Sequence, residues 1–119
     1  MSETIMWCAD KTRLNTFGKR VFRIDEYGAK SWCLNGKLHR EDGPAVEFAN
    51  GDRFWYLDGK QHRVDGPAVE YVNGHKEWYL NDKLHRINGP AFEYANGGKD
   101  WWLHGRHYSE SAYWKELQK

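Results

Sequence analysis

Apolar and aromatic positions recur along this chain with a period of 23 residues. Tryptophan opens each copy, at Trp32, Trp55 and Trp78, and Trp101 opens a fourth copy that breaks off. The copies share the frame W-x-L-[ND]-[GD]-K-x-H-R-x-[DN]-G-P-A-[VF]-E-[FY]-x-N-G. Self-similarity at one fixed period is the signature of a repeat architecture, in which each unit buries apolar surface against its neighbours.

Between the turn residues, short runs rich in Val, Phe, Tyr and Trp predict β-strands. One set of turns is the Asn-Gly step near the end of each copy, at Asn50-Gly51, Asn73-Gly74 and Asn96-Gly97. This step is typical of a type I′ hairpin turn, because both central residues of that turn need positive φ. A second set lies half a repeat away, at Asn35-Gly36, Asp58-Gly59 and Asn81-Asp82. The pattern predicts an all-β repeat, an elongated antiparallel β-meander of stacked hairpins.

The repeat pattern divides the chain into three segments. Residues 1–20 lack the H-R and G-P-A elements, and we expect them to form an irregular N-terminal cap, because terminal units of an array have one neighbour fewer. Residues 21–108 carry the repeat sheet. In residues 109–119, Ser109 is a candidate N-cap, and Tyr113 and Leu117 fall on one helical face. We therefore predict a short C-terminal helix that covers the open edge of the sheet.

The Asn-Gly turns also predict a register. Counting outward from a two-residue turn at Asn73-Gly74 places Val69 opposite Trp78 and Glu70 opposite Glu77. The same count pairs Val46 with Trp55, Phe92 with Trp101 and Glu93 with Asp100. It predicts one face of Trp, Leu and Val, and an opposite face of glutamates with the arginines of the H-R step. Like charges directly opposite each other are unfavourable, so that face should be hydrated unless a bulge shifts the register.

The H-R step supplies the charged candidates for a binding site. Counting from the second set of turns places each histidine (His39, His62, His85) across from a tryptophan, where we expect it to pack on the ring and bond a turn carbonyl. Equivalent residues lie roughly 10 Å apart, too far to share one metal ion. The arginines (Arg40, Arg63, Arg86) either pair with carboxylates inside the repeat or form a ladder for phosphate or acidic groups. His75, His104 and His107 lie off this pattern and are expected at the surface.

Aromatic residues supply the other candidates. They make up 16% of the chain, and a single-layer sheet cannot bury both of its faces, so some rings must be exposed. Exposed rows of Trp and Tyr are typical of protein interaction surfaces. We include in this candidate surface the residues that directly follow the repeat tryptophans, namely Tyr56, Tyr79 and Trp102. Two such sheets could also bury their aromatic faces against each other, so self-association is an alternative.

Composition and charge exclude several classes of protein. The net charge of +1, from 18 basic and 17 acidic residues, gives no bulk attraction to nucleic acid or to an anionic membrane. No apolar run approaches the roughly 20 residues of a membrane span. The N-terminus carries no recognisable secretion signal, so we expect reduced thiols at Cys8 and Cys33 and a cytoplasmic location.

The frame N-G-K-x-x-x-x-D-G-P-A-x-x-Y-x-N-G resembles the MORN repeat, over about Val21 to Tyr108. The H-R pair and the G-P-A step replace the usual G-x-G step of that family, a variant that resembles repeats in bacteriophage and bacterial proteins of unassigned role. The resemblance implies a twisted single-layer sheet of stacked hairpins and non-enzymatic work in scaffolding or protein binding. If a phage encodes the chain, the resemblance places it in the host cytoplasm.

Catalysis has no support in the sequence. A catalytic site groups different side chains around one reacting atom, whereas this chain repeats the same groups at even spacing, with no nucleophile elbow, phosphate loop or H-E-x-x-H motif. We therefore expect no enzyme, cofactor or metal, but a module that binds another protein. The resemblance implies one form of it, a phage inhibitor of a host defence or other host protein. The alternatives are a sponge for a nucleotide-like small molecule and, as the resemblance also implies, an antitoxin-like partner of a toxin. Positions that differ between copies, such as Gln61, Val64, His75 and Arg53, would carry the specificity.

Overall fold

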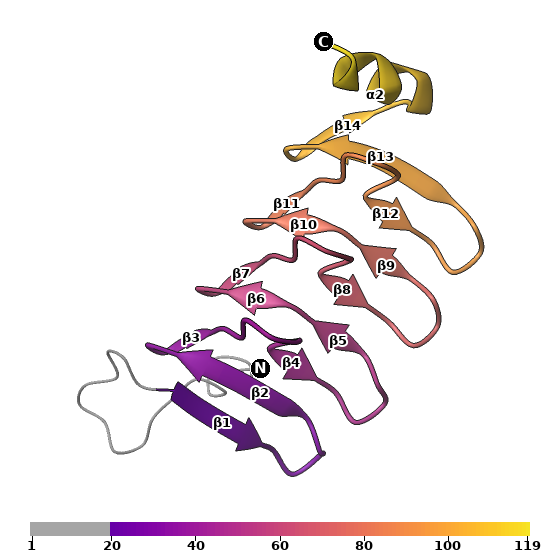
Figure 1. The fold of residues 1–119 in the computed structure, drawn as a ribbon. Helices are drawn as coiled ribbons and strands as arrows, with labels where there is room; N and C mark the ends of the chain where they lie inside the picture. Colours follow the sequence, from indigo (N-terminus) through magenta and orange to yellow (C-terminus); the bar gives the residue numbers. More distant parts are fainter. Residues whose placement is uncertain (1–19) are drawn as a thin grey trace.

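The computed structural model describes residues 20–119, which form an elongated stack of hairpins closed at the C-terminal end by one helix (Figure 1). The stack measures 53 × 29 × 25 Å, and its radius of gyration is 16.2 Å. A compact domain of about 100 residues has a radius near 13 Å. The predicted fold class, an antiparallel β-meander of stacked hairpins with a short C-terminal helix, is confirmed. The proposed N-terminal cap lies almost wholly outside the described residues.

Each copy contributes two kinds of strand pair. The first kind joins into one continuous sheet in the order β1-β2-β4-β5-β8-β9-β12-β13-β14. The second kind forms short hairpins along one side, with β3 on β2 and the separate pairs β6–β7 and β10–β11. The strands are β1 (Arg20–Ile24), β2 (Lys30–Leu34), β3 (Lys37–Leu38), β4 (Val46–Glu47), β5 (Arg53–Phe54), β6 (Tyr56–Leu57), β7 (Lys60–Gln61), β8 (Val69–Glu70), β9 (Lys76–Glu77), β10 (Tyr79–Leu80), β11 (Lys83–Leu84), β12 (Phe92–Glu93), β13 (Lys99–Leu103) and β14 (Arg106–Tyr108).

The two sets of turns differ in type, and they lie on opposite sides of the stack (Figure 1). The turn at Asn35-Gly36 has φ of 56° and 79°, and its counterparts at Asp58, Asn81 and His104 likewise have two successive residues with positive φ. These are type I′ turns, as the Asn-Gly and Asp-Gly steps of this second set indicate. The type I′ turn predicted at Asn50-Gly51 is wrong, because φ is positive at the glycine alone, 102°. Its bonds, Gly51 N–H to the Phe48 carbonyl and Phe48 N–H to the Asp52 carbonyl, define a three-residue loop with a bulged glycine.

This extra loop residue makes the predicted sheet register wrong by one position. Val69 lies opposite Phe54 and Glu77, and not opposite Trp78. The predicted pairs Val46–Trp55 and Phe92–Trp101 fail in the same way, since Val46 lies opposite Phe54 and Phe92 opposite Asp100. A slip of one residue moves a side chain to the other face of a sheet. The tryptophans therefore share a face with the glutamates, and the valines lie on the other face.

The corrected register removes the like-charge pairs. Glu70 lies between Arg53 and Lys76, and Glu93 between Lys76 and Lys99. Glu47 likewise lies between Lys30 and Arg53. Base and acid alternate along the whole row, from β2 to β13. Opposite charges at directly opposed positions contribute roughly 0.2–1 kcal/mol per pair, so the row favours this register over the predicted one.

Small residues fill the centre of the sheet. Ala45, Ala68 and Ala91 are 0% exposed, and Val46 and Val69 are 2% and 1% exposed. The expectation of a reduced thiol at Cys33 is wrong, because this buried residue is disulfide-bonded. The other cysteine of the sequence, Cys8, lies outside the described residues. Disulfides are typical of oxidising compartments, so the thiols no longer argue for a cytoplasmic location.

The C-terminal helix α2 (Glu110–Leu117) packs on β13 and β14. The hydroxyl of Ser109 accepts the Ala112 N–H at 3.2 Å, which confirms Ser109 as the N-cap. Tyr113, on the inner side of the helix, is 0% exposed. Among residues 20–119, no helix is long and apolar enough to cross a membrane.

Candidate functional site

The arginine of each H-R step is held on the tryptophan face of the sheet by four contacts inside its own repeat, which we call the arginine clamp. In the middle copy, the Arg63 guanidinium carbon lies 3.8 Å from the centre of the Trp55 ring. The Arg63 Nε donates to Asp65 at 3.2 Å, and Nη1 donates to the Pro67 carbonyl at 3.0 Å and to Glu70 at 3.2 Å. Arg40 and Arg86 repeat this arrangement on Trp32 and Trp78.

The clamp explains why glycine follows the arginine by three positions. A Cβ built at Gly66 would lie 2.9 Å from the Arg63 guanidinium carbon, and the equivalent distances at Gly43 and Gly89 are 3.0 and 2.8 Å. The guanidinium passes over a position that only glycine leaves open. The R-x-[DN]-G-P-A-x-E part of the frame is thus one arginine-binding arrangement, with side chains 22–24% exposed at the arginines.

The histidines join successive repeats. The predicted pairing across from tryptophan is confirmed, since the His39 N–H donates to the Trp32 carbonyl at 2.9 Å. The predicted bond to a turn carbonyl is wrong. The His39 Nδ1 instead accepts the N–H of Asp58, in the type I′ turn of the next repeat, at 3.0 Å. His62 and His85 accept from Asn81 and His104 in the same way. Because Nδ1 accepts, the ring proton lies on Nε2.

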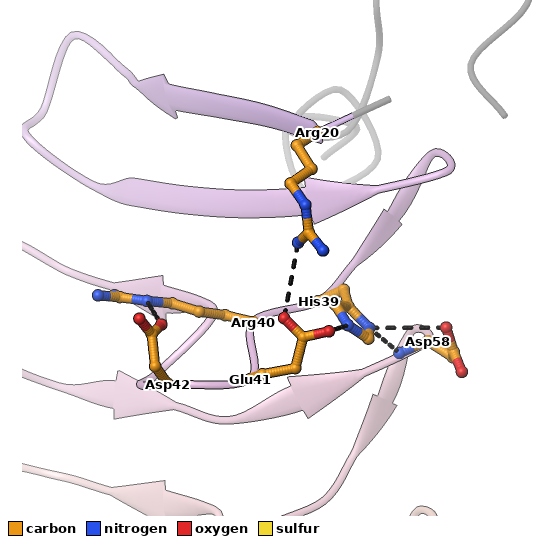
Figure 2. Close-up of polar contacts among 6 residues, drawn as sticks. All are labelled: Arg20, His39, Arg40, Glu41, Asp42 and Asp58. Carbon is orange, nitrogen blue, oxygen red and sulfur yellow. Dashed lines mark hydrogen bonds and ion pairs between the residues drawn. The ribbon is translucent and has the colours of Figure 1, made fainter. Parts of the chain in front are cut away.

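In the first copy the Nε2 of the histidine, His39, bonds to a carboxylate, as Figure 2 shows. The His39 Nε2 donates to Glu41 at 2.8 Å, and Arg20 of β1 lies 3.6 Å from the same carboxylate. The bond from His39 lowers the pKa of Glu41. Later copies have Val64 and Ile87 at this position, and these apolar side chains are 84% and 64% exposed.

Open grooves separate the clamps of successive repeats. The groove above Trp78 has a volume of about 590 Å³, and the groove above Trp55 about 650 Å³. We call them the Trp78 groove and the Trp55 groove. Each has an R-x-[DN]-G loop on both sides, with Leu80 or Leu57 at its floor. Within residues 20–119, no group of three metal-ligating side chains lies close enough to hold a metal ion.

Aromatic rings form a connected row on the opposite face, which we call the aromatic face. Phe54 lies between Phe48 and Tyr71, with ring centres 5.5 and 5.7 Å away. The row continues from Tyr71 to His75, which lies 4.6 Å from Phe92 and 5.4 Å from Tyr94. These rings cover the buried valines and are themselves half-buried or exposed. All extensive contacts in the described chain join neighbouring strands, or join α2 to β13 and β14, so no second layer covers this face.

Acidic groups accompany the rings of the aromatic face. The His75 Nε2 donates to Glu77 at 3.0 Å, and Tyr94 donates to Asp100 at 2.6 Å. Burial, together with the Glu77 charge, raises the pKa of both Tyr79 and Tyr71. The bond to Asp100 raises the pKa of Tyr94. These tyrosines therefore stay neutral hydrogen-bond donors at physiological pH. His75 is half-buried, with its side chain 19% exposed, whereas His104 and His107 are exposed, as expected.

The nine candidate residues do not form one site. Six of them, the arginines and histidines, lie on the clamp side and already hold partners inside the repeat array. Tyr56, Tyr79 and Trp102 follow the tryptophans and point to the other face, where the ring of Trp102 lies 4.9 Å from His107. Sequence reasoning missed the row from Phe48 to Tyr94. The like charges in the predicted register were the available signal, since a shift of one residue removes them and moves these rings to a common face.

The fold and its surfaces define a class, a single-layer array of β-hairpin repeats that carries the aromatic face. Comparison of the chain with protein-family models, curated proteins and solved structures finds no match in any of the three.

Proposed function

We propose that this chain is a non-enzymatic module that binds another protein through its aromatic face. The observation that carries the proposal is the connected row of rings from Phe48 to Tyr94, with no second layer over it in the described chain. Aromatic side chains dominate the energetics of protein interfaces, and contiguous exposed apolar surface is typical of interaction sites. Glu77 and Asp100 beside these rings favour a partner with basic groups.

The finer forms of this proposal rest on the resemblance of the H-R-x-D-G-P-A repeat to phage and bacterial proteins. In one form the chain is a phage-encoded inhibitor of a host defence or other host protein. In the other it is the antitoxin-like partner of a toxin. Both forms use the same face, and the identity of the captured partner distinguishes them.

Affinity capture with matched variants tests the proposal. The double variant Tyr71→Lys with Tyr94→Lys places two charges in the centre of the aromatic face, and we expect it to lose a stoichiometric partner that the wild type retains from a lysate of the native host. Tyr27→Lys is the control, because Tyr27 is a tyrosine 76% exposed in the β1–β2 turn. Thermal melting establishes that each variant is folded. Capture of no stoichiometric protein, or equal capture by all three chains, contradicts the proposal.

A second copy of the chain is the other candidate partner for the aromatic face. Sedimentation equilibrium separates it from binding of a different protein. A dimer that dissociates in the Tyr71→Lys, Tyr94→Lys chain but not in the Tyr27→Lys chain would assign the aromatic face to a second copy.

The nucleotide sponge has one observation in its favour, the grooves lined by arginine, histidine and tryptophan. Against it, the Nε and Nη1 donors of each arginine are committed to partners within the repeat. Arg63→Ala separates the two functions. A sponge would lose the thermal shift given by its nucleotide, whereas a protein-binding module would lose stability and keep its partner.

A further inference from the structure

At the end of the array the helix α2 packs on the last tryptophan and on the last R-x-[DN]-G loop. The fourth copy has Ser109 where the others have arginine. The Trp101 ring is instead packed by Tyr113 and Trp114, at 5.0 and 5.7 Å. The Tyr113 hydroxyl accepts the Gly89 N–H at 3.2 Å and donates to the Arg86 carbonyl. One tyrosine hydroxyl thus forms hydrogen bonds to both ends of an R-x-[DN]-G loop.

The same loop recurs twice without a tyrosine. Arg63 to Gly66 and Arg40 to Gly43 have the same clamp geometry as Arg86 to Gly89. In the part of the chain that the structure describes, no side chain makes the equivalent bond to the Gly66 or Gly43 N–H. Burial reflects the difference, because Gly89 is buried under α2 whereas Gly66 and Gly43 are half-exposed.

The open grooves also lack the apolar cover that α2 provides. Leu103, beside α2, is 6% exposed. Its counterparts Leu57 and Leu80 are only half-buried, at the floors of the Trp55 and Trp78 grooves. On the two sides of the Trp78 groove, Val64 and Ile87 are 84% and 64% exposed. A helix that carries a tyrosine would cover these apolar side chains. Its hydroxyl would bond the glycine N–H and the arginine carbonyl of the loop.

Charge distinguishes a foreign helix from the α2 of a second copy. The loop beside α2 carries the neutral Asn88, whereas the loops of the open grooves carry Asp65 and Asp42, each 87% exposed. The helix α2 has acidic residues at Glu110 and Glu116. Another α2 would bring these acids toward the aspartates, whereas a helix with lysine or arginine at those places would be attracted to them.

We propose that the Trp55 and Trp78 grooves are docking sites for a partner protein's helix that presents a tyrosine flanked by basic residues, bound as α2 binds the last loop. Each tyrosine hydroxyl accepts the N–H of Gly43 or Gly66 and donates to the carbonyl of Arg40 or Arg63. Successive grooves lie roughly 10 Å apart, two strand spacings. This surface lies across the sheet from the aromatic face and does not depend on it.

Nuclear magnetic resonance on the isotope-labelled full chain tests the proposal. The probe is a stapled helical peptide with the sequence of residues 109–119, carrying Glu110→Lys and Glu116→Lys. We expect the Gly66 and Gly43 amide protons to shift downfield on titration, while the Gly89 amide, already bonded to Tyr113, stays in place. The same peptide with Tyr113→Phe should bind roughly two- to tenfold more weakly, the effect of one hydrogen bond, and should give no downfield shift.

Two variants of the full chain locate the site. Val64→Lys puts a positive charge on the apolar rim of both grooves and should weaken binding of the basic peptide at least about tenfold, through loss of rim contact and like-charge repulsion. Val72→Lys is the matched control, because Val72 is 63% exposed at the three-residue turns on the other edge of the sheet. Equal binding by the two variants overturns the proposal, as does a shift at Gly89 without one at Gly66. The Tyr71→Lys, Tyr94→Lys chain should bind the peptide normally, so failure here and failure of the aromatic face are distinguishable.

Discussion

The arginine of the H-R step accounts for most of the residues that recur around it. Trp55 stacks on the Arg63 guanidinium, Asp65 and Glu70 accept hydrogen bonds from it, and Gly66 leaves room for it. Planar guanidinium suits this role because it combines ring stacking with a rigid fork of donors. The identity of these residues across copies therefore follows from folding.

Substitution at the glycine tests this account. Gly66→Ala is expected to lower the free energy of unfolding by about 1–3 kcal/mol, because the new Cβ displaces a guanidinium that makes charged hydrogen bonds. Urea unfolding measures the change. In an Arg63→Ala background the same substitution should cost much less, since no guanidinium remains to be displaced. Equal costs in the two backgrounds would show that Gly66 is required for another reason.

A second prediction concerns the hydrogen bonds by which the histidines join successive repeats. Burial, and next the neighbouring His104, lower the pKa of His85, whose Nδ1 must stay unprotonated to accept the His104 N–H. The unfolded chain therefore binds a proton more readily than the folded chain, so stability rises with pH. The contribution is complete above the unfolded pKa of about 6.5 and is lost as the pH falls below it. Urea midpoints between pH 7.5 and pH 5 should show this fall.

Asn at position 85 provides the control for that prediction. In His85→Asn the amide oxygen takes the place of Nδ1 as acceptor, and the side chain does not titrate. The variant should lose less stability on acidification than the wild type. An identical pH dependence in the two chains would exclude His85 as a source of it.

At the scale of elements, the turns decide the register and α2 decides how the array ends. Both central residues of the Asn35-Gly36 turn have positive φ, whereas in the Asn73-Gly74 loop only the glycine does, at 100°. The same Asn-Gly step thus produced two turn types, and the longer loop moved the tryptophans to the face of the glutamates. At the end of the array, Tyr113 and Trp114 replace the missing arginine on Trp101.

The hydroxyl of Tyr113 should contribute to closing the array. Tyr113→Phe leaves the Gly89 N–H and the Arg86 carbonyl under the helix without their partner. We expect a loss of about 1–3 kcal/mol in the free energy of unfolding and faster hydrogen exchange at Gly89. Tyr27→Phe, at a largely exposed tyrosine, should change neither quantity. Unchanged exchange at Gly89 in Tyr113→Phe would contradict this role for the hydroxyl.

At the scale of the whole molecule, a row of alternating charges runs across the sheet from Lys30 to Lys99. Between these two ends, each charge lies directly opposite charges of the other sign on both sides, so the row opposes a slip in register along the array. Stability in such an array is close to a sum of repeat and interface contributions. A fault in one interface should therefore weaken the stack locally.

Lys76 is the member of the row where such a fault is simplest to make. It lies between Glu70 and Glu93, so Lys76→Glu would place three carboxylates side by side. We expect a loss of about 1–2 kcal/mol from two inverted cross-strand pairs, smaller at high salt because the charges are partly exposed. Lys60→Glu is the control, because Lys60 lies opposite Leu57. Equal losses in the two variants, or no salt dependence, would exclude the charge row as the cause.

Strand content, the type I′ turns and the C-terminal helix follow from local chemistry, so the sequence predicts them. Positive φ favours Asn, Asp and Gly, and serine is among the preferred N-cap residues of helices, as at Ser109. The pairing of each histidine with a tryptophan followed from those turns. The partner of the histidine Nδ1 did not, because the turn that donates to it belongs to the next repeat, 19 residues away in the case of His39 and Asp58.

The sequence by itself determined that this protein is an array of hairpins with a 23-residue period, because a repeated local pattern imposes a repeated local structure. Only the tertiary structure decided which side chains share a face. That choice depends on one extra residue in a loop, where the energy difference between turn types is small beside the charge pairing and ring packing of the whole sheet. The resulting register places the arginines in clamps and leaves two grooves without a tyrosine. It also gathers the rings from Phe48 to Tyr94 on the face proposed to bind a partner.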